Sequence, residues 1–448
     1  PNLAIHSDRL DLPVTDYPGM SLQKVQIVKT PTEVLLSSPK PIWVMMPDIH
    51  RKPMKLVLPE IVQIKFDSLN QAWQLPQTGL TLDSFPVSLS INQLTSSYID
   101  SQFALDVGTM SKLKEYLPYN LMNPNLKKWL TESLQGGESI SVSGAVRGLF
   151  KDFPFDKGDG LFNVSAHVKN AKLKFNAKWP MLQNFDADVV FTPFKIDIAV
   201  DSVNVGSNVV AKDVRVIIPD LDKHDIALTV KGSVKTPLNN AIKYLAMSPV
   251  ADKLGMKEFF KGGAKFGGES NILLDRIWVP ISGHENKKEE VTGSVDFVDS
   301  TIELFEKLKF QNIRGQLLFT DAEVSAKKLT FRLLQGKGSA KIVTNEKTQK
   351  VTVMGSGHFL EGKNNWFAKP IPWDAKLVLP FNSRKDKAIN LNVVANISKA
   401  QSKLPEPLNN EALQNKQIEL KATIARGVVE AHANLPGLVD SKFTWRDS

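Results

Sequence analysis

The sequence predicts a mainly β protein, built as a long, continuous, twisted antiparallel sheet that curves into an open hydrophobic groove and carries a few short amphipathic helices. Three observations predict this fold. Apolar and polar residues alternate along most of the chain, as at 162–169, which is the period of half-buried strands. The motif Gly-Gly-Glu-Ser at 136–139 returns at 267–270, and the segment 183–192 returns at 311–320, so a β-unit of about 130 residues repeats. No Gly/Ser-rich or Pro-rich linker separates the two copies.

The repeat divides the 448 residues into four expected segments. They are an N-terminal β-groove segment (1–108), two helix-plus-strands units (109–236 and 237–404) and the truncated start of a further unit (405–448). The chain begins at Pro1 without a methionine. We therefore expect a piece of a longer protein, with any membrane anchor outside it.

The first segment consists of short alternating stretches interrupted by prolines. Six prolines lie between residues 31 and 59, at Pro31, Pro39, Pro41, Pro47, Pro53 and Pro59. Proline cannot donate a hydrogen bond to a neighbouring strand, so it is excluded from the middle of a sheet. These positions therefore predict strand edges, bends and crossovers.

A helical insertion opens the second segment. Asn123 and Pro124 suit the cap and the first turn of a helix, and we expect the glycines at 136–137 to end it. Leu126, Trp129 and Leu130 form one apolar stripe on this helix. Such a stripe packs on a sheet more often than it lies at a membrane interface, although the neighbouring residues 127–128 are both lysines.

Strands and helical pieces then alternate to the end of the chain. A change of phase near Asn170 predicts a one-residue bulge or turn. A helix-rich piece is expected at 237–260 before the second Gly-Gly-Glu-Ser motif, and a shorter helical piece at 407–414 before the last strands. Because most connections are short, we expect antiparallel pairing.

Composition excludes several functional classes. The net charge is +9, and the basic residues are scattered, so we expect mild attraction to anionic surfaces and no nucleic-acid binding. Cysteine is absent, which excludes disulfides, thiolate metal sites and a cysteine nucleophile. No apolar run in the sequence approaches the roughly 20 residues that span a bilayer.

Few residues suggest chemistry. The seven histidines are isolated, and none has the spacing of a metal-ligand motif. The acidic loop at 156–160 lacks the ligand spacing of a calcium loop and is interpreted as a turn. The glycine-rich stretch at 262–268 follows a helix, whereas phosphate-binding loops precede one, so it is interpreted as a flexible connection to a strand. We therefore expect no enzymatic activity, no metal and no cofactor.

An apolar sheet face must be covered, either by a second sheet in a β-sandwich or by a bound apolar ligand. A trough of this length suits acyl chains, whose headgroups would stay in water. Sixteen residues are predicted to line the trough: Phe162, Val164, Val168, Leu173, Phe175, Val189, Phe191, Phe194, Ile196, Ile198, Leu317, Phe319, Leu377, Leu379, Leu391 and Val393. A scaffold of stacked β-sandwiches is the alternative.

Several motifs resemble the AsmA-like family, most strongly between residues 117 and 331. They are Trp129-Leu130 before Gly136-Gly137, Phe153-Pro154-Phe155-Asp156 ahead of Gly160-Leu161-Phe162, Trp179-Pro180-Met181-Leu182 with Phe185-Asp186-Ala187, and Asn312-Ile313-Arg314-Gly315-Gln316-Leu317.

The resemblance implies a long β-sheet groove in the periplasm of a Gram-negative bacterium, anchored in the inner membrane by a helix that these residues do not include. It implies phospholipids as cargo, moved between the inner and outer membranes, with further protein partners in the periplasm or outer membrane. The alternative function is a non-catalytic scaffold for assembly of the envelope.

Overall fold

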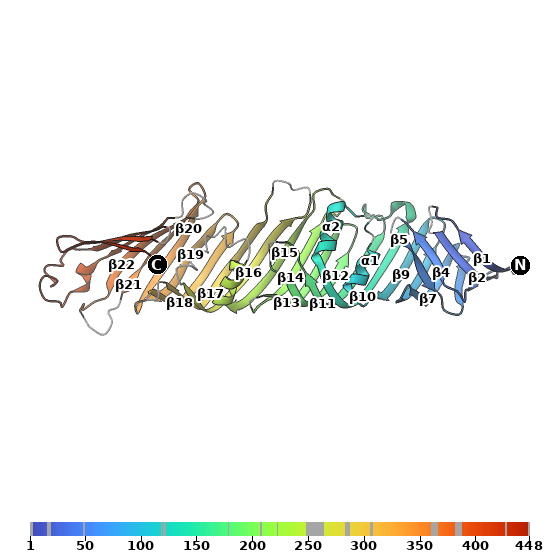
Figure 1. Ribbon diagram of the computed structural model, residues 1–448, viewed down its shortest axis with the longest axis horizontal. Helices are drawn as coiled ribbons and strands as arrows, with labels where there is room; N and C mark the ends of the chain where they lie inside the picture. The colour runs from blue at the N-terminus through green and yellow to red at the C-terminus, as the bar shows by residue number, and fades with distance from the viewer. Residues whose placement is uncertain are drawn as a thin grey trace.

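The computed structural model describes residues 3–15, 19–47, 50–117, 119, 122–177, 179–206, 208–221, 223–247, 264–282, 287–304, 308–359, 366–380, 388–425 and 428–446. They form one antiparallel sheet of 26 strands with three short α-helices. The strands lie across the long axis of an elongated molecule, with β1 at one end and β22 near the other (Figure 1). The predicted long sheet is confirmed, and the alternative of stacked β-sandwiches is wrong.

The N-terminal strands are arranged around two long strands that each pair with two short ones. β2 pairs with both β3 and β4, and β7 pairs with both β5 and β6. Five of the six prolines lie between strands, and Pro53 lies inside β5. The strands are β1 (Leu3–Leu12), β2 (Gly19–Lys29), β3 (Glu33–Ser37), β4 (Ile42–Met46), β5 (His50–Val57), β6 (Val62–Asp67), β7 (Ala72–Leu82), β8 (Phe85–Leu94) and β9 (Tyr98–Asp106).

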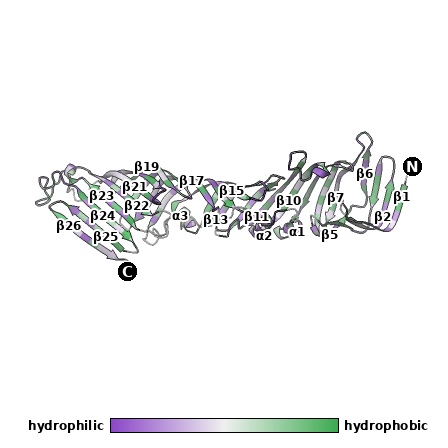
Figure 2. Ribbon diagram, turned by 90° about the horizontal axis from the view of Figure 1, so that it is seen from above, coloured by the Kyte–Doolittle hydropathy of each residue, from purple (hydrophilic) through white to green (hydrophobic). Residues whose placement is uncertain are grey.

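From β7 onward each strand pairs with the next in sequence. Helices α1 (Met110–Tyr116) and α2 (Pro124–Ser133) lie between β9 and β10, and α3 (Leu238–Ala246) follows β15. In Figures 1 and 2 α1 and α2 lie on one side of the sheet. The middle strands are β10 (Leu134–Leu149), β11 (Leu161–Leu173), β12 (Leu182–Phe191), β13 (Lys195–Gly206), β14 (Val209–Pro219), β15 (Ala227–Pro237), β16 (Lys265–Pro280), β17 (Glu290–Leu304), β18 (Leu308–Thr320) and β19 (Val324–Leu333).

The last seven strands form a regular ladder. They are β20 (Gly336–Asn345), β21 (Lys350–Phe359), β22 (Ile371–Pro380), β23 (Ile389–Ala395), β24 (Ile418–Ala425), β25 (Val428–Leu435) and β26 (Val439–Arg446). Their pairing keeps one register throughout each described pair. By contrast, register shifts interrupt most pairs between β10 and β19. Because a bulge bends a strand and increases its twist, these shifts add local bends to the middle section.

The bulges follow the sequence repeat. The predicted bulge at Asn170 is confirmed, with a register shift there and a positive φ of 49°. Asn184 and Asn312 occupy equivalent places in the two copies and have φ values of 54° and 51°. Asn adopts this left-handed conformation more readily than other non-glycine residues. The repeat therefore specifies backbone bends as well as apolar positions.

Three expectations about the helices and glycines need correction. The glycines at 136–137 do not cap α2, because the helix ends at Ser133 and β10 already begins at Leu134. Residues 265–268 belong to β16 and are not a flexible connection, while 262–263 lie outside the described residues. The piece at 407–414 forms turns, since Pro407 and the polar residues after it give no sustained apolar stripe. Of the helix-rich piece at 237–260, α3 is confirmed and residues 248–260 lie outside the described part.

One ion-pair cluster stabilises the polar side of the sheet. Asp197 on β13 accepts hydrogen bonds from Arg215 Nε and Nη2 at 2.8 and 2.7 Å and from Lys195 Nζ at 2.8 Å. The hydrogen bonds from Arg215, and then those from Lys195, hold the pKa of the Asp197 carboxyl well below its usual range, although burial opposes the shift.

We expect Asp197→Asn to lower the free energy of unfolding by about 2 kcal/mol at pH 7. A carboxyl whose pKa is depressed on folding contributes stability above its unfolded pKa of about 3.9, and this contribution is lost as the pH falls through the folded pKa. The difference between parent and variant should therefore shrink below about pH 4 in urea titrations across pH. Asp201→Asn, at an exposed carboxylate on the same strand, should change stability by less than about 0.5 kcal/mol. A pH-independent difference would contradict the assignment.

Candidate functional site

One face of the sheet is apolar over most of its strands, from β7 to β17 and from β19 to β26. Residues directly opposite each other in an antiparallel pair point to the same face, so the register shows which side chains share it. One row crosses eleven strands and contains only apolar residues: Leu80, Val87, Leu105, Val142, Ala166, Val189, Ile198, Val216, Val230, Ile277 and Val291. We call this side of the sheet the apolar face, and the opposite side the polar face.

A second row crosses the C-terminal strands without interruption. It consists of Ala326, Ile342, Val353, Leu377, Leu391, Ala422, Ala431 and Phe443, on β19 to β26. Helices α1 to α3 pack on other strands, whereas the short 3-10 helix Ile397–Ala400 packs on β22, and most side chains of this row are half-buried. Figure 2 shows hydrophobic and hydrophilic residues alternating along these strands. Among the described residues, the apolar face of β20–β26 is thus covered only in part.

The register places most of the sixteen predicted lining residues on this one face. Val164 pairs with Phe191, which pairs with Ile196, and Val189 pairs with Ile198. Leu377 pairs with Leu391 in the C-terminal row. Those that lie half-buried on the apolar face are Phe162, Val164, Val189, Phe191, Ile198, Leu317, Phe319, Leu377, Leu379, Leu391 and Val393.

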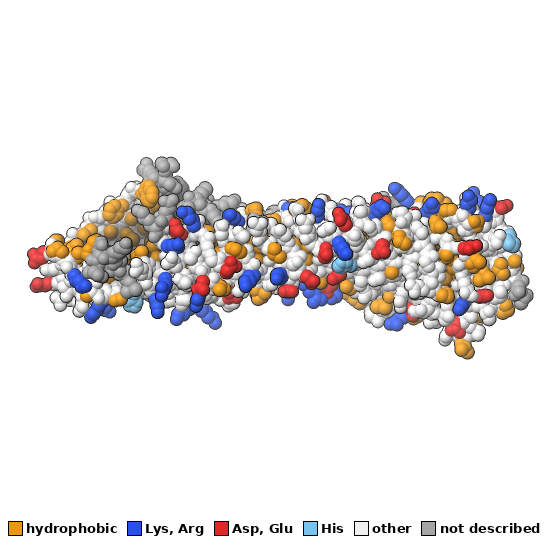
Figure 3. Space-filling view, turned by 90° about the horizontal axis from the view of Figure 1, so that it is seen from below, with side chains coloured by type: hydrophobic (Ala, Val, Ile, Leu, Met, Phe, Trp, Pro, Cys, Tyr) orange, Lys and Arg blue, Asp and Glu red, His pale blue; other side chains and the backbone are white. Residues whose placement is uncertain are grey.

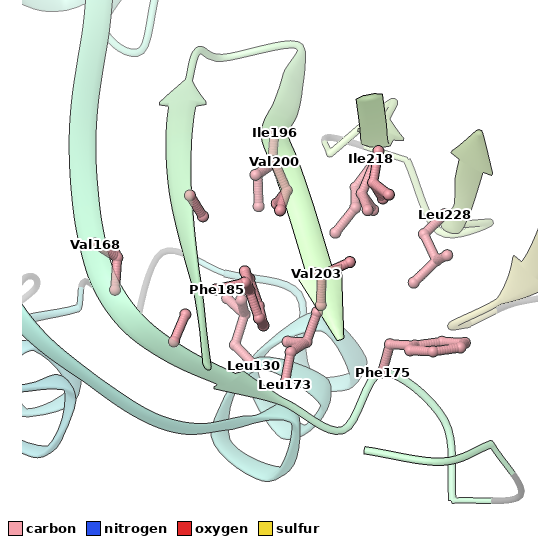
Figure 4. Packing of buried hydrophobic residues seen from close by; sticks show 14 of the residues in the cluster. Leu130, Val168, Leu173, Phe175, Phe185, Ile196, Val200, Val203, Ile218 and Leu228 are labelled. Atoms are coloured by element: carbon pink, nitrogen blue, oxygen red, sulfur yellow. The ribbon is translucent and has the colours of Figure 1, made fainter. Parts of the chain in front are cut away.

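Four predicted residues are buried in a large hydrophobic cluster, and five half-buried ones pack against it, namely Val164, Val189, Phe191, Ile198 and Phe319. Val168, Leu173, Phe175 and Ile196 are each less than 9% exposed and belong to one large hydrophobic cluster. Figure 4 shows them converging with residues of α2, β12, β14 and β15. We call this cluster the central core. The sequence pattern could not separate these four from the open positions, because both have the same alternation.

Helix α2 closes the apolar face over the central core. Leu126 and Leu130 are buried against the sheet, and the indole Nε1 of Trp129 donates a hydrogen bond to the carbonyl of Phe175 at 2.9 Å. The side chain of Asn123 accepts from the backbone N–H of Asn125, as predicted for the cap. The apolar stripe of α2 therefore packs on the sheet.

Phe194 is the exception among the predicted residues. It lies in the turn between β12 and β13 and is 49% exposed.

Two hollows in the protein surface are lined in part by predicted residues. One of about 900 Å³ lies over β7–β12 and includes Val189. One of about 620 Å³ lies over β22–β26 and includes Leu391, but most of its lining, such as Lys376 and Lys421, belongs to the polar face.

Aromatic rings lie across glycines on the apolar face. A Cβ atom at Gly293 would come within 2.7 Å of the Phe319 ring, and one at Gly144 within 2.5 Å of the Phe103 ring. An aromatic side chain that covers a glycine on the next strand protects its exposed backbone.

The described residues show no group of three or more His, Asp or Glu that could bind a metal ion. Two histidines each contact one carboxylate on the sheet: His167 with Asp188 at 2.7 Å, and His432 with Asp440 at 2.6 Å. Residues 156–160 form the predicted turn, with Gly158 at a φ of 79°. The chemical character of this side of the sheet is apolar.

Sequence reasoning missed two sets of lining residues. The eleven-strand row contains small residues such as Ala166 and positions in the N-terminal segment such as Leu80 and Val87, where the motifs are weak. The ends of the C-terminal row, including Ala431 and Phe443, were also missed. Alternation was present in both, but only the strand register shows that these residues continue a row.

None of the described helices is long and apolar enough to cross a membrane. A family model described as YhdP protein matches residues 14–448. The intermembrane phospholipid transporter YhdP of Escherichia coli (strain K12) is 25% identical over 329 residues, which cover 69% of this chain and 25% of that protein. The chain therefore spans about a quarter of the length of this relative. No solved structure matches the chain.

Proposed function

Because the chain belongs to the YhdP family, we propose that it is a periplasmic section of an inner-membrane-anchored protein that carries phospholipids between the inner and outer membranes. The observation that supports this most directly is the apolar face, on which apolar side chains continue in register from strand to strand along the molecule. The relative's transport activity fits such a surface.

The energetics favour acyl chains as the ligand. Each CH₂ group that leaves water for an apolar surface contributes about 0.8 kcal/mol. The C-terminal row crosses eight strands, and a strand spacing of about 4.8 Å makes it about 34 Å long, longer than one acyl chain. An acyl chain can therefore move along the row in small steps and keep most of its contact area. The headgroup stays in water, and no bond is made or broken.

The repeat gives this section its length. We propose that residues 109–236 and 237–404 are two copies of a helix-plus-strands unit, preceded by a groove segment at 1–108 and followed by the start of a further unit at 405–448. Each unit would extend the apolar face by several strands. Helix α2 is proposed to divide the face at the central core.

Mass spectrometry of lipids that co-purify with the chain tests the proposal. We expect phospholipids in stoichiometric amounts, and photo-activatable acyl probes should crosslink to half-buried residues such as Leu377 and Leu391 on the apolar face. The polar-face neighbour Val378 should crosslink far less. A lipid-free protein without acyl crosslinks would refute the proposal.

A further inference from the structure

The positive charge of the chain is concentrated at one end. Residues 324–448 contain 20 Lys and Arg against 10 Asp and Glu, a net charge of +10, whereas residues 1–323 contain 36 against 37, a net charge of −1. The excess of positive charge therefore belongs to β19–β26 and their connections, whereas the basic residues earlier in the chain are balanced by acidic ones. Figure 3 shows Lys and Arg side chains along the lower edge of the C-terminal part of the molecule.

The register assembles part of this charge into one line on the polar face. Lys341 pairs with Met354, Met354 with Lys376, Lys376 with Asn392, Asn392 with Lys421, Lys421 with His432 and His432 with Lys442. We call Lys341, Lys376, Lys421 and Lys442 the lysine row. Its members lie on alternate strands, so neighbouring lysines are about 10 Å apart and the row is about 29 Å long.

The lysine row is available to a ligand. All four lysines are exposed, and within the described residues Lys341, Lys376 and Lys442 make no ion pair. Lys421 pairs with Glu419 of its own strand at 2.8 Å. Lys376, Lys421 and Lys442 also line the hollow of about 620 Å³, where the acidic residue is Glu430.

We propose that the polar face of β20–β26 binds an anionic lipid surface through the lysine row. The ladder keeps one register from β20 to β26, so the lysines form one line across the strands, and three of them also line the hollow. Lysine is a flexible point charge, suited to a fluid array of phosphates, whereas arginine provides the fixed two-pronged geometry of specific protein sites. Met354 and Val343, 43% and 38% exposed on the same face, provide apolar contacts among the headgroups. This surface is opposite the apolar face and is a separate site from the proposed lipid path.

Sedimentation with vesicles tests this proposal. The full chain should bind vesicles of phosphatidylcholine with about 30 mol% phosphatidylglycerol, and should bind neutral phosphatidylcholine vesicles much more weakly. Each lysine near an anionic surface contributes about 1 kcal/mol, or roughly fivefold in affinity. The variant Lys376→Glu/Lys421→Glu/Lys442→Glu should therefore lose about 100-fold or more in affinity. Binding by the parent should also be lost at about 1 M salt, where the Debye length is about 3 Å.

The matched control is Lys212→Glu/Lys231→Glu/Lys235→Glu, which makes the same change in net charge at exposed lysines of β14 and β15. It should bind anionic vesicles within about twofold of the parent. Equal binding to neutral and anionic vesicles, or full binding by the lysine-row variant, would overturn the proposal. Binding to soluble polyaspartate without binding to vesicles would assign the row to an acidic protein and would also overturn it. Co-purified phospholipid should be unchanged in the lysine-row variant, so failure of this proposal and failure of the transport proposal give different results.

Discussion

Phe319→Asp should reduce the phospholipid bound per chain at least tenfold while the protein stays folded. Phe319 is half-buried on the apolar face and lies over Gly293. A carboxylate there remains partly hydrated in the free protein, so the fold loses mainly the ring contacts, about 1–2 kcal/mol. An acyl chain that covers the carboxylate must remove that hydration, which costs several kcal/mol. The same reasoning applies to Phe191→Asp.

The control for this variant is Leu318→Asp, on the neighbouring residue of the same strand. Leu318 is 46% exposed and points to the polar face, so its replacement should leave bound phospholipid unchanged. Lipid would be quantified by mass spectrometry, and folding by circular dichroism and thermal unfolding. If Phe319→Asp unfolds the chain, position 319 is part of a closed core and the proposed lipid path is interrupted at β18.

Leu228→Ala should destabilise the middle of the sheet by about 3–4 kcal/mol. Leu228 on β15 is fully buried and pairs with Val279, which is 2% exposed. Removing three carbon atoms from a closed cluster leaves a cavity that the curved backbone cannot easily fill. Leu377→Ala, at a half-buried position on the open part of the apolar face, should cost about 1.5 kcal/mol, since part of that side chain is already in water.

Hydrogen exchange of peptides from β14–β16 and β21–β23 would measure these two effects separately. A long sheet can open locally, so a single global transition is a poor measure of either substitution. Equal losses of stability in Leu228→Ala and Leu377→Ala would mean that the apolar face is covered at β22 as well. That result would contradict an open surface in the C-terminal section.

The sheet could be predicted because its signal is local. Alternation fixes which side chains share a face, and the repeated motifs give the length of the unit, so the β class and the bulge at Asn170 were both accessible from sequence. The ends of elements were less accessible. The glycines at 136–137 resemble a helix cap, yet tertiary pairing with β11 extends β10 across them.

The division between the central core and the rest of the apolar face could not be predicted, because it depends on which other elements pack over each side chain. Ile196 and Ile198 have the same spacing and chemistry, yet Ile196 is buried in the central core while Ile198 is half-buried. The lysine row also depends on pairing. Its four members are 35, 45 and 21 residues apart in sequence, and only the strand register brings them into line.

The pairing of each strand from β7 onward with the next in sequence also determines how the molecule can assemble. Such a sheet has low contact order, since every new strand finds its partner in the segment just completed. Stability is then nearly a sum of nearest-neighbour terms, as in other linear repeat proteins, and folding can start at any hairpin and extend in both directions. A longer chain of this design could grow strand by strand without rearranging what has already folded. The length of the molecule can therefore change by adding or removing hairpins. Each hairpin then changes the free energy of folding by nearly the same amount.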